Sequence, residues 1–303
     1  MIIDAHMHLS GHGWVRGSYL RWVWNEFIDK YNKIHGTNIT SDELADIMRG
    51  YIDPEADKLV EILDKAGVDK GVIFSVDWAL MTGEPRVTIR EQNKLHADAA
   101  RKHPGRFISL CALDPRRGNC MELAKEAIEE WGMRGFYLMP AAGFRPDDPI
   151  CYPLYEKCID WKVPVNIHCG METKHLDYNH PMYIANVALD YPELNVILGH
   201  AGLEIWKEEA KQIATKHNIY LDFSGYQTFW WRRPEKFYDW LRDAIDLAGA
   251  NKIMWASGFP NTDVLVSEKN WIKVIKDPKT DINFTEDEKQ WILGKTAEQV
   301  YPA

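Results

Sequence analysis

The feature that most constrains this sequence is a series of short apolar runs, rich in β-branched residues, that recur along the chain. From the second run onward, their starts lie about 25 to 36 residues apart, and each interval holds an amphipathic stretch long enough for a crossover helix. The runs are too apolar for a sheet with one face in water. This alternation predicts an α/β protein with parallel strands. The eight runs cover residues 2–6, 71–76, 107–112, 134–139, 163–168, 194–199, 219–223 and 252–256.

Eight strand and helix units predict a (β/α)8 TIM barrel, a fold that takes about 250 residues as one domain. No Gly/Ser-rich or single-sign run marks a linker, so we expect residues 1–303 to form one domain. An open doubly wound sheet is the structural alternative. In a barrel, the chemistry lies at the carboxyl ends of the strands.

The interval between the first and second runs is exceptional, because 69 residues separate their starts. Residues 11–52 therefore form an insertion after the first strand. This insertion carries a cluster of tryptophans and the helical-looking segment 41–48. We expect it to lie over the mouth of the barrel and to act as a lid.

Two helix signals are specific enough to test. Asp53-Pro54 predicts an N-cap and first helical residue, and Gly67 predicts the end of that helix. Thr285 with Glu288 predicts a capping box at the start of the last helix.

Charge and cysteine content limit the partners and the compartment. The 36 Lys+Arg against 45 Asp+Glu give a formal charge of -9, which argues against nucleic acid and against an anionic membrane surface. No apolar run approaches the roughly 18 residues of a membrane span, and the N-terminal residues are too polar for a signal peptide. Five cysteines without a C-x-x-C pair fit a reducing compartment. We expect a cytoplasmic protein.

Histidines stand at the ends of several predicted strands. His6 and His8 are two residues apart, so in an extended chain their side chains point the same way. His168 closes the fifth run and His200 the sixth, and the seventh ends in Asp222-Phe223-Ser224-Gly225. Since strand ends converge in a barrel, His6, His8 and His168 are predicted to bind one metal ion. A hydrogen-bonded polar layer is the alternative, and His200 fits a general acid/base better than a ligand.

With these motifs in order along nearly the whole chain, the sequence resembles the amidohydrolase superfamily. The resemblance is to the amidohydrolase-related branch that includes aminocarboxymuconate semialdehyde decarboxylase and γ-resorcylate decarboxylase. Asp4-Ala5-His6-Met7-His8 resembles the first-strand H-x-H, residues 165–170 the fifth-strand IHxG and residues 197–202 the sixth-strand xHxG.

The resemblance implies one divalent ion, usually zinc with manganese as the alternative, bound by His6, His8 and His168. It also implies that His200 faces the substrate or metal-bound water. Binuclear members use a lysine on the fourth strand, and residues 135–139 contain none.

The eighth strand departs from the family pattern, because Gly258 stands where an aspartate ligand is expected. Glycine cannot bind a cation or accept a proton, so this chain is expected to be impaired in both. Three explanations are open: an introduced change, a natural one with chemistry that does not need the carboxylate, or Asp263 folding back into the site. The first explanation predicts that Gly258→Asp raises activity and metal occupancy.

A cationic site suits a small carboxylate substrate, which an arginine can clamp. Trp231 and Arg232 after the seventh strand, and Arg145, are the predicted substrate-binding residues. The leading hypothesis is a metal-dependent decarboxylase of a small cyclic or unsaturated carboxylic acid. Alternatives are a metal-dependent hydrolase of a lactone, amide or ring ketone, and a barrel that binds a small molecule without turnover. A homodimer is the expected assembly.

Overall fold

A computed structural model describes residues 1–170 and 175–301 of the chain. Each of the eight predicted runs contains a strand, and the third is divided at Leu110 into two short strands. The strands are β1 (Ile3–Met7), β2 (Lys70–Ile73), β3 (Phe107–Ser109), β4 (Cys111–Ala112), β5 (Phe136–Leu138), β6 (Val165–His168), β7 (Val196–Gly199), β8 (Ile219–Asp222) and β9 (Ile253–Met254).

All the paired strands run parallel, in the orders β1-β2-β3 and β4-β5-β6-β7-β8-β9. Backbone hydrogen bonds connect the two sheets on both sides. Leu110 N donates to Ile73 O at 3.0 Å, and Ala5 N donates to Trp255 O at 3.1 Å. Met7 also forms an isolated parallel bridge with Phe259. The strands therefore follow the order of the chain, as the barrel prediction requires, and the fold is that of a TIM barrel.

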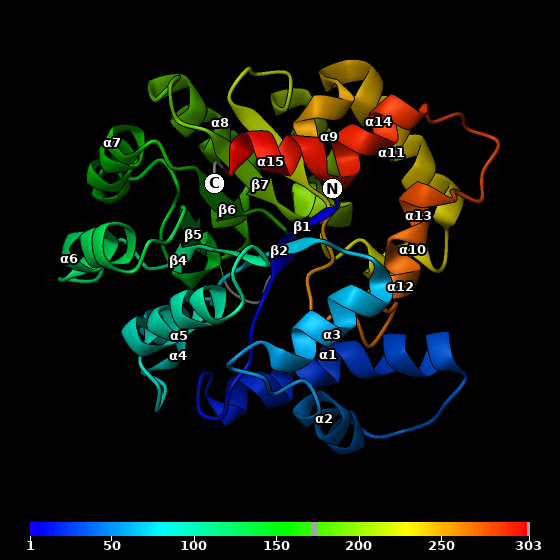
Figure 1. The fold of residues 1–303 in the computed structure, drawn as a ribbon, viewed down its shortest axis with the longest axis horizontal. Coiled ribbons are helices and arrows are strands. Elements are labelled where there is room, and N and C mark those ends of the chain that lie inside the picture. The colour runs from blue at the N-terminus through cyan, green and yellow to red at the C-terminus, as the bar shows by residue number, and fades with distance from the viewer. Residues whose placement is uncertain (171–174, 302–303) are drawn as a thin grey trace.

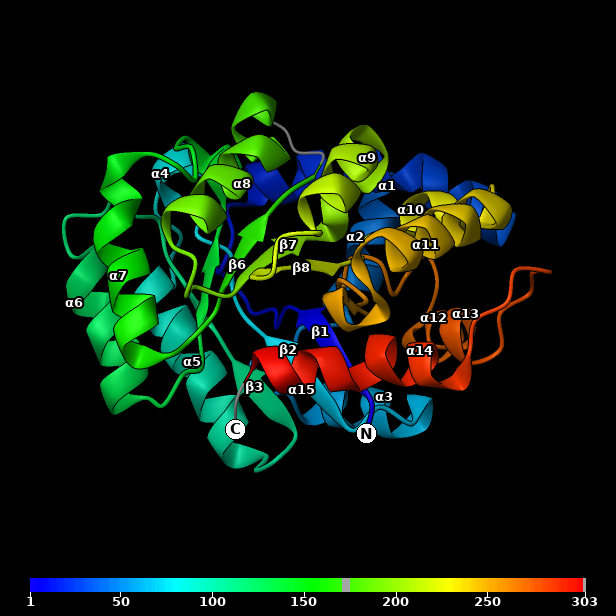
Figure 2. The ribbon, with the colours of Figure 1, turned by 90° about the horizontal axis from the view of Figure 1, so that it is seen from above.

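Helices surround the strands (Figure 1), and the last helix contacts the first strand (Figure 2). The α-helices are α1 (Gly17–His35), α2 (Ser41–Arg49), α3 (Asp57–Ala66), α4 (Ala79–Thr82), α5 (Ile89–Lys102), α6 (Cys120–Lys125), α7 (Tyr152–Trp161), α8 (Pro181–Asp190), α9 (Leu203–Ile213), α10 (Gln227–Trp230), α11 (Pro234–Ala248), α12 (Glu268–Trp271), α13 (Lys273–Lys276), α14 (Glu286–Gln290) and α15 (Thr296–Val300). Short 3-10 segments are η2 (Pro140–Ala142), η3 (Pro149–Cys151), η4 (Leu176–Asn179), η5 (His200–Gly202) and η6 (Ala250–Lys252), and π-helical turns are η1 (Glu126–Glu130) and η7 (Trp291–Lys295).

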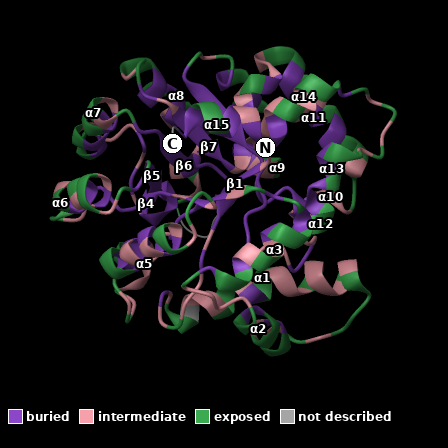
Figure 3. Cartoon of the chain, in the orientation of Figure 1, coloured by how far each residue is buried: buried purple, intermediate pink, exposed green. Residues whose placement is uncertain are grey.

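The core is one large apolar cluster between the strands and the surrounding helices, and the strands are buried along almost their whole length (Figure 3). Strands buried on both faces explain why their sequences read as continuous apolar runs. The five cysteines are free and buried in this core or at its edge. None of the helices within the described residues is long and apolar enough to cross a membrane.

The insertion at residues 11–52 contains α1 and α2 and rests on loops that follow two strands. Trp24 and Met48 pack with Val264 and Leu265 after β9. At the other end of α1, the ring of Tyr19 lies 4.9 Å from that of Trp78, which follows β2. Both loops lie at carboxyl ends of strands, so the insertion lies at that end of the barrel.

The helix signals gave mixed results. The Thr285 and Glu288 capping box is present, and Gly67 ends α3 in the left-handed conformation with φ 74°. The N-cap prediction at Asp53 was wrong, because α3 begins at Asp57 and its N-cap residue is Ala56. The Asp53 carboxylate still accepts a hydrogen bond from Leu59 N at 2.9 Å, so it stabilises the first turn from outside the helix.

Candidate active site

His6 and His8 project from β1 on the same side, as their spacing predicts. Their Nε2 atoms lie 3.2 Å apart. His6 is fully buried and His8 is partly buried. Two imidazole nitrogens of one tetrahedral ion with bonds of 2.0–2.1 Å lie about 3.3 Å apart, so this separation fits a shared metal ion.

The protons of these two rings are fixed by their partners. His6 Nδ1 lies 3.0 Å from the Asp222 carboxylate, and His8 Nδ1 lies 3.0 Å from Phe74 O. A carboxylate and a carbonyl only accept, so each Nδ1 carries the proton and each Nε2 presents a lone pair. Two lone pairs at 3.2 Å cannot bond to each other, and a cation between them satisfies both. The donor set therefore fits a metal ion.

His168 and His200 complete a cluster of four histidine rings. The centroid of the His200 ring lies 4.5 Å from that of His6 and 4.5 Å from that of His168. His168 Nδ1 lies 2.9 Å from the hydroxyl of Tyr137 on β5, and His200 Nδ1 lies 3.2 Å from Ser224 O. The residues predicted from four strand ends are thus brought together.

Asp222, the last residue of β8, lies beneath this cluster and is fully buried. Its Oδ2 accepts from His6 Nδ1 and from Asn166 Nδ2 at 3.1 Å. Its Oδ1 accepts from His200 N, from Ser224 N and from Ser224 Oγ, the last at 2.5 Å. Burial opposes ionisation of Asp222, but the neighbouring imidazoles of His6 and His200 and these hydrogen bonds hold its pKa well below the usual value. Asp222 is therefore an anionic support of the cluster.

Burial keeps His8, His168 and His200 neutral. It lowers the pKa of His8 and of His200 well below the usual value, and the neighbouring imidazole of His6 lowers both further. The pKa of His168 falls to about 3 for the same two reasons. Neutral imidazole is the form that binds a metal ion, so these rings are prepared as ligands.

Distance alone selects a different trio. Among the described residues, one group offers ligand atoms within 4.8 Å of one another, and it consists of His6, His200 and Asp222. However, both oxygens of Asp222 already accept at least two hydrogen bonds, and His6 faces Asp222 with its protonated Nδ1. This geometry is typical of a carboxylate that orients a metal-binding histidine from behind.

Gly258 lies beside this group. Its N donates to His6 O at 2.8 Å, and its φ is 76°. A Cβ at this position would lie 3.3 Å from Thr262 Oγ1, which is closer than an ordinary contact, 3.4 Å from Gly225 N and 3.5 Å from Ser224 Cβ, and the left-handed backbone conformation strains it further. The backbone is left-handed in another part of the site too, because His200, Ala201 and Leu203 also have positive φ.

The expectation that Asp263 could fold back into the site is wrong. Its Oδ2 accepts from the hydroxyl of Tyr51 at 2.8 Å, and its Oδ1 accepts from Glu268 N at the start of α12. Asp263 thus links the insertion to α12 as a capping residue, and it does not replace the missing carboxylate.

The predicted substrate-binding residues lie in exposed ion pairs or loops. The half-exposed Arg232 guanidinium lies 3.3 Å from the Glu204 carboxylate and 5.9 Å from the ring of Trp231. Trp231 Nε1 donates to Thr228 O at 3.1 Å. Arg145 pairs with Asp147 at 3.0 Å and covers the ring of Tyr183. No contact between these three side chains and the four histidines is found in the described part of the chain.

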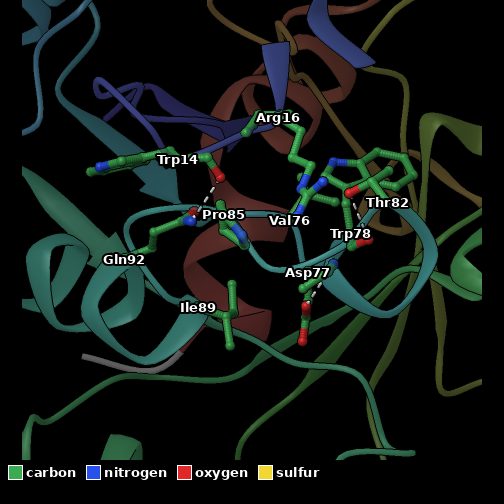
Figure 4. A pocket seen from close by; sticks show the side chains of 11 residues that line it. Trp14, Arg16, Val76, Asp77, Trp78, Thr82, Pro85, Ile89 and Gln92 are labelled. Carbon is green, nitrogen blue, oxygen red and sulfur yellow. Dashed lines mark hydrogen bonds between the residues drawn. The ribbon is translucent and has the colours of Figure 1, made fainter. Parts of the chain in front are cut away.

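A small hollow lies where the start of the insertion meets the loop after β2. Figure 4 shows Trp14 and Gln92 on one side of it and Trp78 and Thr82 on the other. Gln92 Nε2 donates to Trp14 O at 2.8 Å and so attaches the insertion to α5. The loop after β2 also packs on η2 after β5, through Trp78 and Met139. The lining therefore combines aromatic and apolar residues with the polar side chains of Arg16, Asp77, Thr82 and Gln92.

Sequence reasoning did not assign the residues that hold the histidines. Tyr137, Ser224 and the support role of Asp222 were missed, although Asp222 and Ser224 stand in the polar ending of the seventh run. The available signal was that two polar residues at alternate positions of a strand end share a face.

Comparison with known proteins agrees with this fold. The sequence pattern of the family described as "Amidohydrolase" matches residues 3–303. Among solved structures, an uncharacterised TIM-barrel protein of Bordetella bronchiseptica has a TM-score of 0.71 at 20% identity, with 99% of this chain and 97% of that chain covered. No curated protein matches the sequence.

Two solved decarboxylases are also similar in fold. The 5-carboxyvanillate decarboxylase of Sphingomonas paucimobilis has a TM-score of 0.66 at 14% identity, with 99% and 98% of the two chains covered. The dihydroxybenzoic acid decarboxylase of Polaromonas sp. JS666, solved with manganese and 2-nitroresorcinol, has a TM-score of 0.66 at 16% identity, with 99% and 96% covered.

The fold and the site together define a TIM barrel with a histidine cluster at the carboxyl ends of its strands. The chain belongs to the amidohydrolase family, which its sequence motifs had indicated.

Proposed function

We propose that this protein is a metal-dependent decarboxylase of a small cyclic or unsaturated carboxylic acid, with aromatic acids as the first substrates to test. The observation that carries the proposal is the pair of imidazole lone pairs at 3.2 Å on β1, beside two further histidines. Membership of the amidohydrolase family supports it. The choice of substrate class rests on similar folds, among them a decarboxylase complexed with 2,6-dihydroxybenzoate.

In this proposal, His6, His8 and His168 hold one divalent ion. The ion supplies positive charge that orients a substrate carboxylate or hydroxyl and stabilises negative charge as it develops. Three nitrogen donors without a carboxylate favour zinc, because manganese prefers oxygen ligands. Manganese is the alternative, and it is the ion in the dihydroxybenzoic acid decarboxylase structure.

His200 relays the proton of the reaction. Ser224 holds its Nδ1–H, so Nε2 faces the cluster with a lone pair that takes up a proton from a substrate hydroxyl or from water and passes it to the carbon. Decarboxylation adds one proton to the carbon that carried the carboxylate, while the carbon–carbon bond breaks and CO2 leaves. A histidine that delivers this proton contributes about 10²–10⁴-fold to the rate.

The insertion at residues 11–52 is the lid in this proposal, because α1 reaches from Trp78 after β2 to Val264 after β9. Trp231 and Arg232 would contact substrate only if Arg232 left its pair with Glu204, whose charge is half exposed. An exposed ion pair stabilises a protein by at most about 1 kcal/mol, so breaking the pair with Glu204 to contact substrate costs little free energy. Arg145 is the weaker candidate, since Asp147 and Tyr183 both hold it.

The proposal is tested by release of CO2. The protein is loaded with zinc or manganese and incubated with 2,6-dihydroxybenzoate, 5-carboxyvanillate and related acids. Separate incubations with lactones test the hydrolase alternative. We expect CO2 from at least one acid and none from His200→Asn. Lactone opening without CO2 would establish the hydrolase alternative, and ligand binding without any turnover would establish the non-catalytic one.

A further inference from the structure

Ser224 connects the buried carboxylate of the site to His200. Its Oγ lies 2.5 Å from Asp222 Oδ1 and 2.8 Å from His200 Nδ1, and its backbone O lies 3.2 Å from the same nitrogen. The side chain is completely buried. Ser224 is therefore in contact with the acid and the imidazole at once.

The direction of each hydrogen bond follows from what the partners can donate. Both Asp222 oxygens accept from groups that can only donate, namely Asn166 Nδ2 and the backbone N–H groups of His200 and Ser224, so the Ser224 hydroxyl donates its proton to Oδ1. The same oxygen then accepts from His200 Nδ1, and the carbonyl of Ser224 accepts from that N–H too. The chain of bonds runs from His200 through Ser224 to Asp222.

This order differs from that of a hydrolytic triad, in which histidine lies between serine and acid. Here the serine lies in the middle and its proton goes to the carboxylate. The imidazole nitrogen that contacts the hydroxyl in the described part of the chain, His200 Nδ1, already carries a proton and cannot act as a base, so Ser224 is not a nucleophile. Its position suits orientation of a ring, as in the carboxylate-supported histidines of metal sites.

Asp222 thereby supports two imidazole rings with different proposed roles, the metal ligand His6 and the proton-transfer residue His200. Its Oδ2 holds His6 directly, and its Oδ1 reaches the His200 side chain only through Ser224. Loss of the Ser224 hydroxyl removes the second connection and leaves the first intact. The contributions of the two connections can therefore be separated by mutation.

We propose that Ser224 is a positioning residue that holds His200 in the Nδ1–H tautomer, with Nε2 aimed at the substrate. The inference rests on the proposed function for the role of His200, but the tautomer itself can be measured without a substrate. Asp222 anchors the arrangement, and the strained backbone at residues 200–203 places the ring within reach of Ser224.

The test compares wild type, Ser224→Ala and Ser224→Thr, each loaded with zinc. The ¹⁵N shifts of the His200 ring report the tautomer. We expect a single Nδ1–H form in wild type and Ser224→Thr, and a mixed or exchange-broadened signal in Ser224→Ala. With an active acid, kcat of Ser224→Ala should fall at least tenfold with KM changed less than twofold, and Ser224→Thr should recover most of it.

Metal content provides the second readout. Ser224→Ala should bind as much zinc as wild type. Asp222→Asn should lose both its zinc and the single tautomer of His200, because the substitution weakens the hydrogen bonds that support the rings of His6 and His200. Thr296→Val is the matched control, since it removes a buried hydroxyl bond on α15, to Ala250 O, outside the site. It should match wild type in both readouts.

The outcomes separate the inference from the function. Unchanged His200 shifts and unchanged kcat in Ser224→Ala would overturn the positioning role, even if the protein releases CO2. A changed tautomer in a protein that decarboxylates no acid would uphold the positioning role and contradict the proposed function.

Discussion

At the scale of single residues, the site depends on which nitrogen of each histidine is protonated. We predict that His8→Asn and His168→Asn lose the bound ion on dialysis, measured by elemental analysis. His200→Asn should keep the ion and lose CO2 release by about 10²–10⁴-fold. If His200→Asn loses the ion while His168→Asn retains it, the ligand set is the trio of His6, His200 and Asp222, and our assignment is wrong.

A second residue-scale prediction concerns Glu268, whose carboxyl is buried beside that of Asp4. Burial, and then the charge of Asp4, raise the pKa of Glu268 well above the usual value, so folding favours its protonated form. Glu268→Gln keeps a donor toward Asp4 and should unfold with nearly wild-type free energy. Glu268→Ala should cost about 2–4 kcal/mol.

The same pair gives a sign for the pH dependence. The folded state holds the Glu268 proton more tightly than the unfolded chain, whose pKa is near 4.5. The resulting stability is complete below that pH and is lost as pH rises toward the folded pKa. In urea unfolding between pH 5 and 8, the free energy of unfolding should fall more steeply with pH in wild type than in Glu268→Gln, whose residue 268 cannot titrate. Parallel curves would show that Glu268 is ionised in the folded protein.

At the scale of elements, the end of β9 allows a direct test of the missing carboxylate. Gly258→Asp should raise zinc occupancy but lower the unfolding free energy by about 1–2 kcal/mol, because residue 258 has φ 76°. Gly258→Ala carries the same strain without a carboxylate and should lower stability without gaining metal. Equal metal content in the two variants would show that position 258 is not a ligand position in this chain.

The helix α1 allows a test of the lid. Tyr19→Ala removes the ring contact with Trp78 and should speed amide hydrogen exchange in α1, while exchange in β6 and β7 stays slow. A bound aromatic acid should slow exchange in α1 of the wild type. Leu247→Ala on the exposed face of α11 is the control and should leave α1 unchanged. If amide exchange in α1 of Tyr19→Ala stays slow, the insertion at residues 11–52 is fixed in place and does not act as a lid.

The elements also show what sequence can predict. The strands were found because both of their faces are buried, which makes each an unbroken apolar run. The capping box at Thr285 was found because it is local. The start of α3 was missed since its cap, Ala56, adopts the left-handed conformation, which no residue type there signals. The break at Leu110 was missed because residues 107–112 contain no Gly, Pro, Asn or Asp that would mark it.

At the scale of the whole molecule, the sequence could place the histidines at one end of the barrel but not orient their rings. Parallel order fixes which strand ends meet, and this brings His6, His168 and His200 together. The supports come from side chains that meet only after folding, such as Tyr137 with His168 and Asp222 with His6. Their roles depend on distances that no local pattern encodes.

Because the predicted ligands come from β1 and β6, the ion can bind all three only in the folded chain. Binding to the folded state alone stabilises it by about 2.7 kcal/mol when free ion is at 100 times Kd. Chelation should therefore lower Tm by several degrees in wild type, measured by calorimetry, and restoring zinc should reverse the change. His168→Asn should show a much smaller response. An equal Tm with and without zinc in wild type would mean that the three rings do not bind one ion together.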